Sequence, residues 1–239
     1  MASARLKAWP RKYLFQAPRG WLLKLFSRSN ARMRAEIAGK SVVIVGNAKS
    51  LLSRDFGDEI EAADIVIRLN KGFAVEPRAQ GARTDMVGLT PELSEAEVEE
   101  KFAPRFWLML IPKMRHYRIF KRAHVRSTLF YPFRWWLADR NLIGRRPSSG
   151  FMAISWLMRL DCAGSVTLYG FDFGQTATYY NPVGYKTPHN FAREGEIVRG
   201  WAAAGRLRIV QAESVTGAAD APAGVGAATG AGSAEGSVE

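Results

Sequence analysis

An unbroken run of four β-branched residues, Val42 to Val45, constrains the fold of this chain more than any other feature. Such a run predicts a strand that is buried on both faces, which is typical of a mostly parallel sheet covered by helices. Gly46 follows the run and allows a tight turn at the carboxyl edge of the strand. Because open α/β sheets bind ligands at that edge, Asn47 is interpreted either as a helix cap or as a ligand-binding amide.

A second apolar segment, Asp64 to Leu69, also ends on an asparagine, Asn70. An amide offers both donors and an acceptor, so two amides at the ends of neighbouring strands suit a nucleobase or a ribose. Further strands are predicted over residues 106–111, 166–169 and 207–210, an apolar helix over 151–160 and an acidic surface helix within 91–100. The pattern predicts a single-domain, Rossmann-like α/β fold with a mostly parallel sheet.

The loop from Pro147 to Gly150 carries two hydroxyls and a glycine directly before the predicted apolar helix. Backbone amides and hydroxyls at a helix N-terminus stabilise an anionic phosphate or carboxylate. An ordinary serine cap would account for one of the two serines but not for the whole loop.

Histidine is the side chain best suited to take a proton near neutral pH, and the chain has three. His116 and His124 lie in a strongly basic segment. His189 follows a loop that contains glycine and proline, and it precedes a predicted helix that begins near Asn190. Without other evidence, a single loop histidine is more often a surface residue than a base.

Three stretches in the expected order resemble the motifs of the sialyltransferases that use CMP-sialic acid, glycosyltransferase family 29. VVIVGNAKSLL…DIVIRLN…GARTDMVG is similar to the large sialyl motif, PSSG…YGF to the small motif, and His189 with Glu194 to the His-x4-Glu motif. The resemblance covers roughly Ser41 to Gly200 and suggests a bacterial-type member. It implies a GT-A-like fold, a CMP-sugar donor, a glycan or glycolipid acceptor, transfer with inversion and no cofactor.

The resemblance also implies roles for individual residues. His189 would be the catalytic base, and Glu194, about one and a half helical turns later, would orient or support it. The implied donor-binding residues are Asn47, Asn70, Ser148, Ser149, Gly150 and Phe171. The family usually has a histidine where this chain has Thr178, so Tyr179, Tyr180, Thr178 or the serine loop must stabilise the leaving group. No metal is implied, because the chain lacks an Asp-x-Asp pair and CMP carries one phosphate.

Other functions remain open at this point. A transferase that uses another CMP-sugar, such as CMP-Kdo, would need the same nucleotide and keto-acid contacts. A nucleotide-sugar or anionic-polymer binding protein without turnover would share the donor residues. A nucleic-acid binder is suggested by charge alone and is disfavoured, because no recognisable nucleic-acid motif accompanies the charge. A hydrolase is disfavoured because the chain has no nucleophile-elbow sequence.

The formal net charge of +12 over 239 residues is unevenly distributed. Residues 1–34 hold nine Lys or Arg and no acid, and aromatic residues alternate with them. No apolar run there approaches the roughly 20 residues of a spanning helix, and no clear cleavage site follows. Two interpretations stay open: contact with an anionic membrane surface, or a basic amphipathic helix packed on the domain.

Composition sets off a basic aromatic segment (1–38) and a Gly/Ala/Ser-rich tail (213–239) that is expected to be disordered. The resemblance implies that the part between them (39–212) is a glycosyltransferase domain. The single cysteine, Cys162, excludes an internal disulfide and favours a reducing compartment. The expected location is therefore the cytoplasm, with contact to the inner face of the membrane where the basic segment binds lipid.

Residues 101–146 combine twelve Lys or Arg with a single acid, Asp139, and with many aromatic side chains. Aromatic faces stack on sugar rings, and guanidinium groups bind carboxylates or phosphates. The segment is a candidate acceptor surface, although for any single residue a place in the core or on a solvated face is the simpler interpretation.

Overall fold

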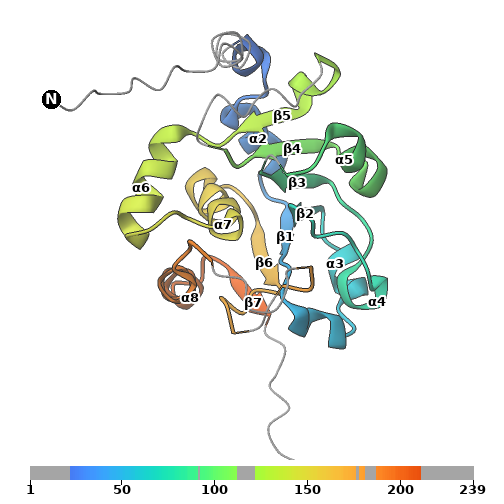
Figure 1. The fold of residues 1–239 in the computed structure, drawn as a ribbon, viewed down its shortest axis with the longest axis vertical. Helices are drawn as coiled ribbons and strands as arrows, with labels where there is room; N and C mark the ends of the chain where they lie inside the picture. Colours follow the sequence, from blue (N-terminus) through green and yellow to red (C-terminus); the bar gives the residue numbers. More distant parts are fainter. Residues whose placement is uncertain (1–21, 91, 112–121, 176–177, 181–186, 211–239) are drawn as a thin grey trace, which may run out of the picture.

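The computed structural model describes residues 22–90, 92–111, 122–175, 178–180 and 187–210. Its strands are β1 (Ser41–Val45), β2 (Ile65–Leu69), β3 (Met86–Leu89), β4 (Phe106–Met109), β5 (Thr128–Phe130), β6 (Ser165–Tyr169) and β7 (Arg208–Val210). Within the described residues they form one sheet in the order β5-β4-β3-β2-β1-β6-β7, and all pairs are parallel (Figure 1). The predicted Rossmann-like α/β architecture is confirmed.

The strand order reverses at β1, which lies in the interior of the sheet. From β1 the chain adds β2 to β5 on one side, and it then returns to add β6 and β7 on the other side. Val45 at the end of β1 is in register with Arg68 of β2 and with Tyr169 of β6. The carboxyl ends of β1 and β6 therefore form the topological switch point at which open α/β sheets bind ligands.

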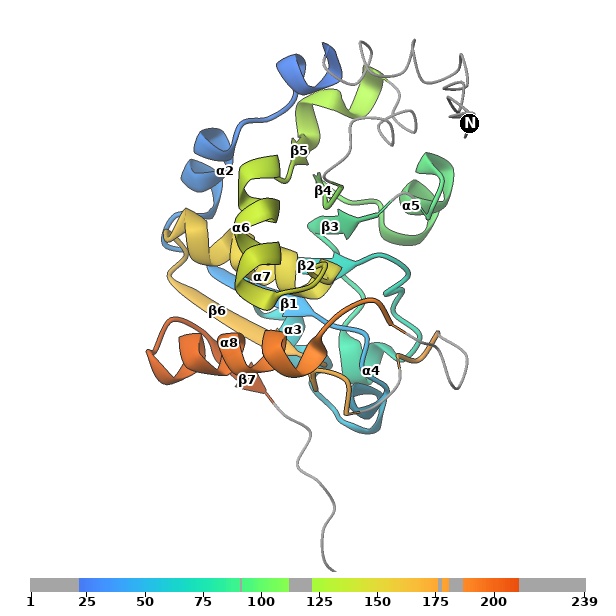
Figure 2. The ribbon, with the colours of Figure 1, turned by 60° about the vertical axis from the view of Figure 1, so that its left-hand side comes forward.

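One face of the sheet is covered by α2 (Asn30–Ile37), α6 (Phe133–Ile143), α7 (Ser149–Leu160) and α8 (Phe191–Ala203) (Figure 2). Val42 and Ile44 of β1 point to this face, whereas Val43 and Val45 point to the other. This alternation is the two-residue period of a strand, and it explains why the β-branched run is apolar at every position.

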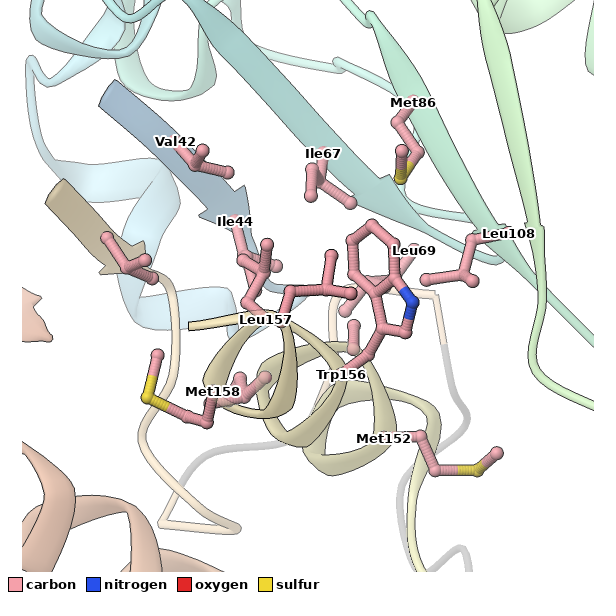
Figure 3. Close-up of a cluster of buried hydrophobic side chains, with 14 of the residues drawn as sticks. Val42, Ile44, Ile67, Leu69, Met86, Leu108, Met152, Trp156, Leu157 and Met158 are labelled. Atoms are coloured by element: carbon pink, nitrogen blue, oxygen red, sulfur yellow. The ribbon is translucent and has the colours of Figure 1, made fainter. Parts of the chain in front are cut away.

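The α7 helix forms the centre of that layer, because nine of its residues are buried. Figure 3 shows Trp156 of α7 directed at the sheet between Leu69 and Leu108. The Trp156 side chain is fully buried, and its indole nitrogen donates to the side-chain oxygen of Asn30 at 3.0 Å. Burial of so large an aromatic side chain fixes α7, and with it the loop at its N-terminus, against the sheet.

The other face is covered by shorter elements. They are the 3₁₀ helix η1 (Lys49–Ser53) and the helices α3 (Gly57–Glu61), α4 (Pro77–Gln80) and α5 (Glu95–Phe102), while the 3₁₀ helix η3 (Arg122–Ser127) precedes β5. The acidic segment forms α5 as predicted, and a capping box between Ser94 and Glu97 closes its N-terminus. Its Val98 and Phe102 are nevertheless buried against β3 and β4.

Two sequence-based predictions need correction. Strands β3 and β5 were not expected, so the strand predicted at Phe106–Ile111 is the fourth rather than the third. The folded domain begins before Gly39, because Met33 and Ile37 of α2 are fully buried in the main core. For this part of the basic segment, packing on the domain is the observed arrangement. The predicted tail lies outside the described residues.

Candidate active site

A cavity of about 660 Å³ opens at the switch point between β1 and β6. The two strand ends approach closely there, since a Cβ atom at Gly46 would lie 2.3 Å from the carbonyl oxygen of Gly170. Only glycine fits at that position. The wall of the cavity includes most of the predicted site residues, namely Asn47, Asn70, Ser148, Ser149, Gly150, Phe171, Tyr180, His189 and Glu194. The structure thus gathers residues that are up to 147 positions apart in the sequence.

His189 is half-buried at the wall of this cavity, just before α8. Its Nδ1 lies 2.9 Å from the backbone carbonyl oxygen of Arg146. A carbonyl oxygen can only accept a hydrogen bond, so Nδ1 carries the proton and Nε2 keeps its lone pair. Burial also lowers the pKa of His189 from its ordinary value, which favours the neutral imidazole. The side chain is therefore oriented and protonated as a general base requires.

Glu194, one turn into α8, is buried and holds the serine loop. One carboxylate oxygen accepts from the backbone N–H of Ser148 at 2.7 Å, and the other accepts from the Ser148 hydroxyl at 2.6 Å. The same hydroxyl oxygen accepts from the N–H of Phe151 and caps α7. Burial raises the pKa of Glu194 to about 7, although the hydrogen bonds from Ser148 act in the opposite direction. These contacts of the carboxylate fix the N-terminus of α7, whereas the contact to His189 Nδ1 comes from the Arg146 carbonyl. The expected role of Glu194, to orient or support His189, stays a prediction.

Asn47 does not cap a helix, because η1 begins two residues later with no side-chain cap. Instead its Nδ2 donates to the carbonyl oxygen of Leu69 and to the hydroxyl of Tyr180, both at 3.2 Å. These contacts tie the end of β1 to the end of β2 and to the segment around Tyr180.

Asn70 has a left-handed backbone with φ of 48°. Its side-chain oxygen accepts from both the backbone N–H and the hydroxyl of Thr90, at 2.9 and 3.0 Å. Within the described residues no acceptor binds its Nδ2, so this donor is available to a ligand in the cavity. Asparagine tolerates the left-handed region better than other non-glycine residues, which explains the residue type at this turn.

The two adjacent tyrosines differ in position. The Tyr179 hydroxyl donates to the carbonyl oxygen of Phe73 at 3.0 Å, and burial raises the pKa of Tyr179 to about 12. Tyr180 lines the cavity, as does Thr178, whose strand-like contact with Ala48 places it beside the end of β1. The Thr178 hydroxyl is buried and has no hydrogen-bond partner among the described residues.

Comparison with known proteins identifies the family. The sequence profile of glycosyltransferase family 29 (sialyltransferase) matches residues 3–137, more than half of the chain. The chain belongs to glycosyltransferase family 29. No curated protein sequence matches it.

Solved structures of mammalian sialyltransferases share the fold. A mammalian sialyltransferase in complex with Gal-beta-1-3GalNAc-ortho-nitrophenol superimposes with a TM-score of 0.60 at 18% identity, over 81% of this chain and 78% of that one. Another mammalian sialyltransferase structure gives a TM-score of 0.55 at 18% identity, over 81% and 84% of the two chains. The GT-A-like prediction and the assignment as a sialyltransferase-type glycosyltransferase are therefore confirmed.

The family 29 profile ends at residue 137, before the serine loop and His189. The roles of the individual site residues remain predictions that rest on the geometry above. The sequence placed Arg146, which acts through its backbone carbonyl, and Trp136 of α6 only within the candidate acceptor segment 101–146, and it did not predict that either lines this cavity. A backbone contact leaves no signal in residue type, and Trp136 is one aromatic residue among many in its segment. Among the described residues, no cluster of three or more His, Cys, Asp or Glu side chains is arranged to hold a metal ion.

Proposed function

We propose that this family 29 enzyme transfers a sialic-acid-like keto-sugar from a CMP-activated donor to a hydroxyl of a glycan or glycolipid, with inversion at the anomeric carbon. The observation that carries the proposal is the contact between His189 Nδ1 and the Arg146 carbonyl, which leaves a basic Nε2 in a cavity at the switch point. The N-terminus of α7 and the amides of Asn47 and Asn70 line the same cavity.

In the proposed reaction His189 Nε2 takes the proton of the acceptor hydroxyl while its oxygen attacks the anomeric carbon. The bond from that carbon to the phosphate oxygen breaks, and its electron pair leaves with CMP. A single displacement by a hydroxyl that approaches opposite the leaving phosphate inverts the anomeric centre. The transition state has oxocarbenium character, and the cavity walls shield it from water.

The departing phosphate gains negative charge, so hydrogen-bond donors must stabilise it. The first-turn amides of α7, at Ser149 and Gly150, supply the positive end of a twelve-residue helix. Tyr180 is held at the wall by Asn47. The Thr178 hydroxyl, which has no hydrogen-bond partner among the described residues, occupies the position where the family usually has a histidine. In this proposal Tyr179 supports the pocket from behind, because its proton is committed to Phe73.

The donor assignment predicts selective stabilisation by nucleotide. CMP should raise the melting temperature of the protein and UMP should not, because a ligand that binds the native state alone stabilises it. Asn47→Ala should reduce the shift, since it removes the amide that positions Tyr180. Thermal unfolding with both nucleotides measures this, and equal shifts with CMP and UMP would reject the cytidine assignment.

The sugar is tested separately from the nucleotide. The geometry is compatible with CMP-sialic acid and with CMP-Kdo, which share the keto-acid carboxylate, so both donors should be offered with a glycan acceptor and CMP release measured. Faster release with CMP-sialic acid supports the proposal. Faster CMP release from CMP-Kdo would identify CMP-Kdo as the donor instead. CMP release from neither donor would contradict the proposal that the protein is a transferase.

We also propose that residues 22–26 touch an anionic membrane surface, which would place the enzyme at the inner face of a membrane. Leu22, Leu25 and Phe26 are 58%, 76% and 62% exposed, and Lys24 is exposed among them. Apolar side chains interleaved with basic ones suit the interface of an anionic bilayer. Among the helices of the described residues, none has the length and apolarity needed to cross a membrane.

This contact is tested by substitution, because a deletion that reached Met33 would remove a buried side chain from the core. The double variant Leu25→Asp, Phe26→Asp should sediment less with vesicles of anionic phospholipid than the wild type. High salt should weaken the wild-type interaction as well, since exposed charges are screened. Undiminished sedimentation of the double variant would exclude residues 22–26 as the contact.

A further inference from the structure

Trp136 forms part of an aromatic and cationic stripe at the edge of α6 that continues from the cavity to the surface. Its indole lines the cavity and stacks on the Phe133 ring, with ring centroids 5.8 Å apart and an interplanar angle of 13°. The Arg140 guanidinium carbon lies 5.7 Å from the Trp136 ring centroid. These three residues are spaced three and four positions apart, so they follow one line along the helix.

The neighbouring tryptophan, Trp135, has a different environment from Trp136. Trp135 contacts Tyr131 edge-on at 6.0 Å and lies beneath the Arg159 guanidinium, on the side of α6 that faces α7. Both tryptophans pack against the main core, but of the two only Trp136 also lines the cavity. Phe133 is 51% exposed, so the stack extends from the half-buried Trp136 into solvent.

The stripe lies on the same side of the cavity as His189, the proposed base. The loop that follows α6 supplies the Arg146 carbonyl that orients His189, and Figure 2 shows α6 running into this loop before α7 begins. The nucleotide contacts proposed above come instead from Asn47 and Asn70, at the ends of β1 and β2. A sugar on Trp136 would therefore approach the base from solvent, as an acceptor must.

The charge around the stripe is positive. Arg134, Arg140, Arg145 and Arg146 all lie within residues 131–151, where Asp139 is the single acid. Asp139 is fully buried and forms an ion pair with Arg159 at 2.7 Å. Within the described residues no carboxylate pairs with these four arginines. Of the four, Arg140 contacts the Trp136 ring and Arg146 lines the cavity, so these two can bind an anionic group of a ligand.

We propose that Trp136 is an acceptor-binding residue that stacks on a sugar ring, and that Arg140 beside it and Arg146 at the cavity wall select a glycan bearing an anionic group, a carboxylate or a phosphate. This rests on the proposed function, because it assigns the acceptor of the same reaction. The apolar C–H face of a sugar stacks on an indole as other apolar groups do, and the anion gains charge-assisted hydrogen bonds from the guanidinium groups.

The test measures acceptor kinetics with three galactose-terminated disaccharides, which are neutral, carboxylated or phosphorylated on the second sugar. Trp136→Ala should raise the acceptor KM by about tenfold, the loss expected for one aromatic stack. It should leave the thermal shift by CMP unchanged. Trp136→Phe should retain most of the affinity. Leu142→Ala, an exposed position on the same helix outside the cavity wall, is the matched control.

A separate variant tests whether positive charge contributes to acceptor binding. Arg140→Gln, at an exposed position, should raise the KM for whichever anionic disaccharide the wild type prefers and leave that for the neutral one unchanged. Preference for the carboxylated or for the phosphorylated sugar identifies the anion. If Trp136→Ala misfolds, Trp136→Leu, which keeps apolar bulk without a ring, takes its place.

Several results would overturn this inference. They are an unchanged acceptor KM in Trp136→Ala or Trp136→Leu, loss of the CMP shift in either variant, or a wild type that prefers the neutral disaccharide. Failure of the proposed function is a different result, since the wild type would then release no CMP from a CMP-sugar with any of the three acceptors.

Discussion

Replacing His189 by alanine is expected to lower the rate of sugar transfer by roughly 10² to 10⁴, the usual contribution of a general base. Donor binding should survive, because the contacts proposed for CMP come from Asn47, Asn70 and the start of α7. The variant should therefore lose turnover while CMP still raises its melting temperature. Steady-state kinetics together with thermal unfolding measures both quantities on the same preparation.

The pH profile is an independent check on His189. Burial lowers its pKa from the ordinary value of 6.5, so the wild-type rate should stay high through neutral pH and fall only as pH drops below that value. His124→Ala should keep this acidic limb, because the His124 ring lies against Trp107 and between Glu95 and Glu99, away from the cavity wall. Near-full activity of His189→Ala would place the base elsewhere, and loss of the CMP shift would move His189 into the donor site.

The parts of the fold that the sequence predicted are those with strong local signals. The run from Val42 to Val45 becomes β1, and the Ser148 loop caps α7, because burial on both faces and helix capping both constrain residue types locally. Strand β3 was missed since it has four residues, one of them Gly88, and depends on its neighbours for its conformation. Strand β5 has three residues, which are too few to show the alternating pattern of a strand.

The site was predicted as a set of residues but not as a set of contacts. Resemblance to known motifs brought His189, Glu194 and Ser148 to one place, and the cavity wall contains all three. Which carboxylate oxygen meets which donor depends on how α8 packs against α7, and this tertiary contact leaves no trace in residue spacing. The same holds for the Arg146 carbonyl, since every residue type has one.

Glu194 links this buried contact to stability. In Glu194→Ala the N–H and the hydroxyl of Ser148 lose their partner, and an unsatisfied buried polar group costs about 1–3 kcal/mol. The free energy of unfolding should fall by about 2–4 kcal/mol, which lowers the melting temperature by roughly 5–15 °C in a chain of this size. Glu196→Ala, at an exposed position on the same helix, is the control and should change stability little.

Glu194→Gln separates the charge of Glu194 from its hydrogen bonds. Because burial raises the pKa of Glu194 to about 7 from 4.5, the native state binds its proton more tightly than the unfolded chain does. This contribution to stability is fully present below pH 4.5 and is lost as pH rises through about 7. The difference in unfolding free energy, wild type minus Glu194→Gln, should therefore fall across this window by on the order of 3 kcal/mol and then level off. Denaturant unfolding between pH 4 and 8 measures it. A difference that stays constant would mean that the Ser148 hydrogen bonds balance the effect of burial and that Glu194 has the same pKa in the native and unfolded states.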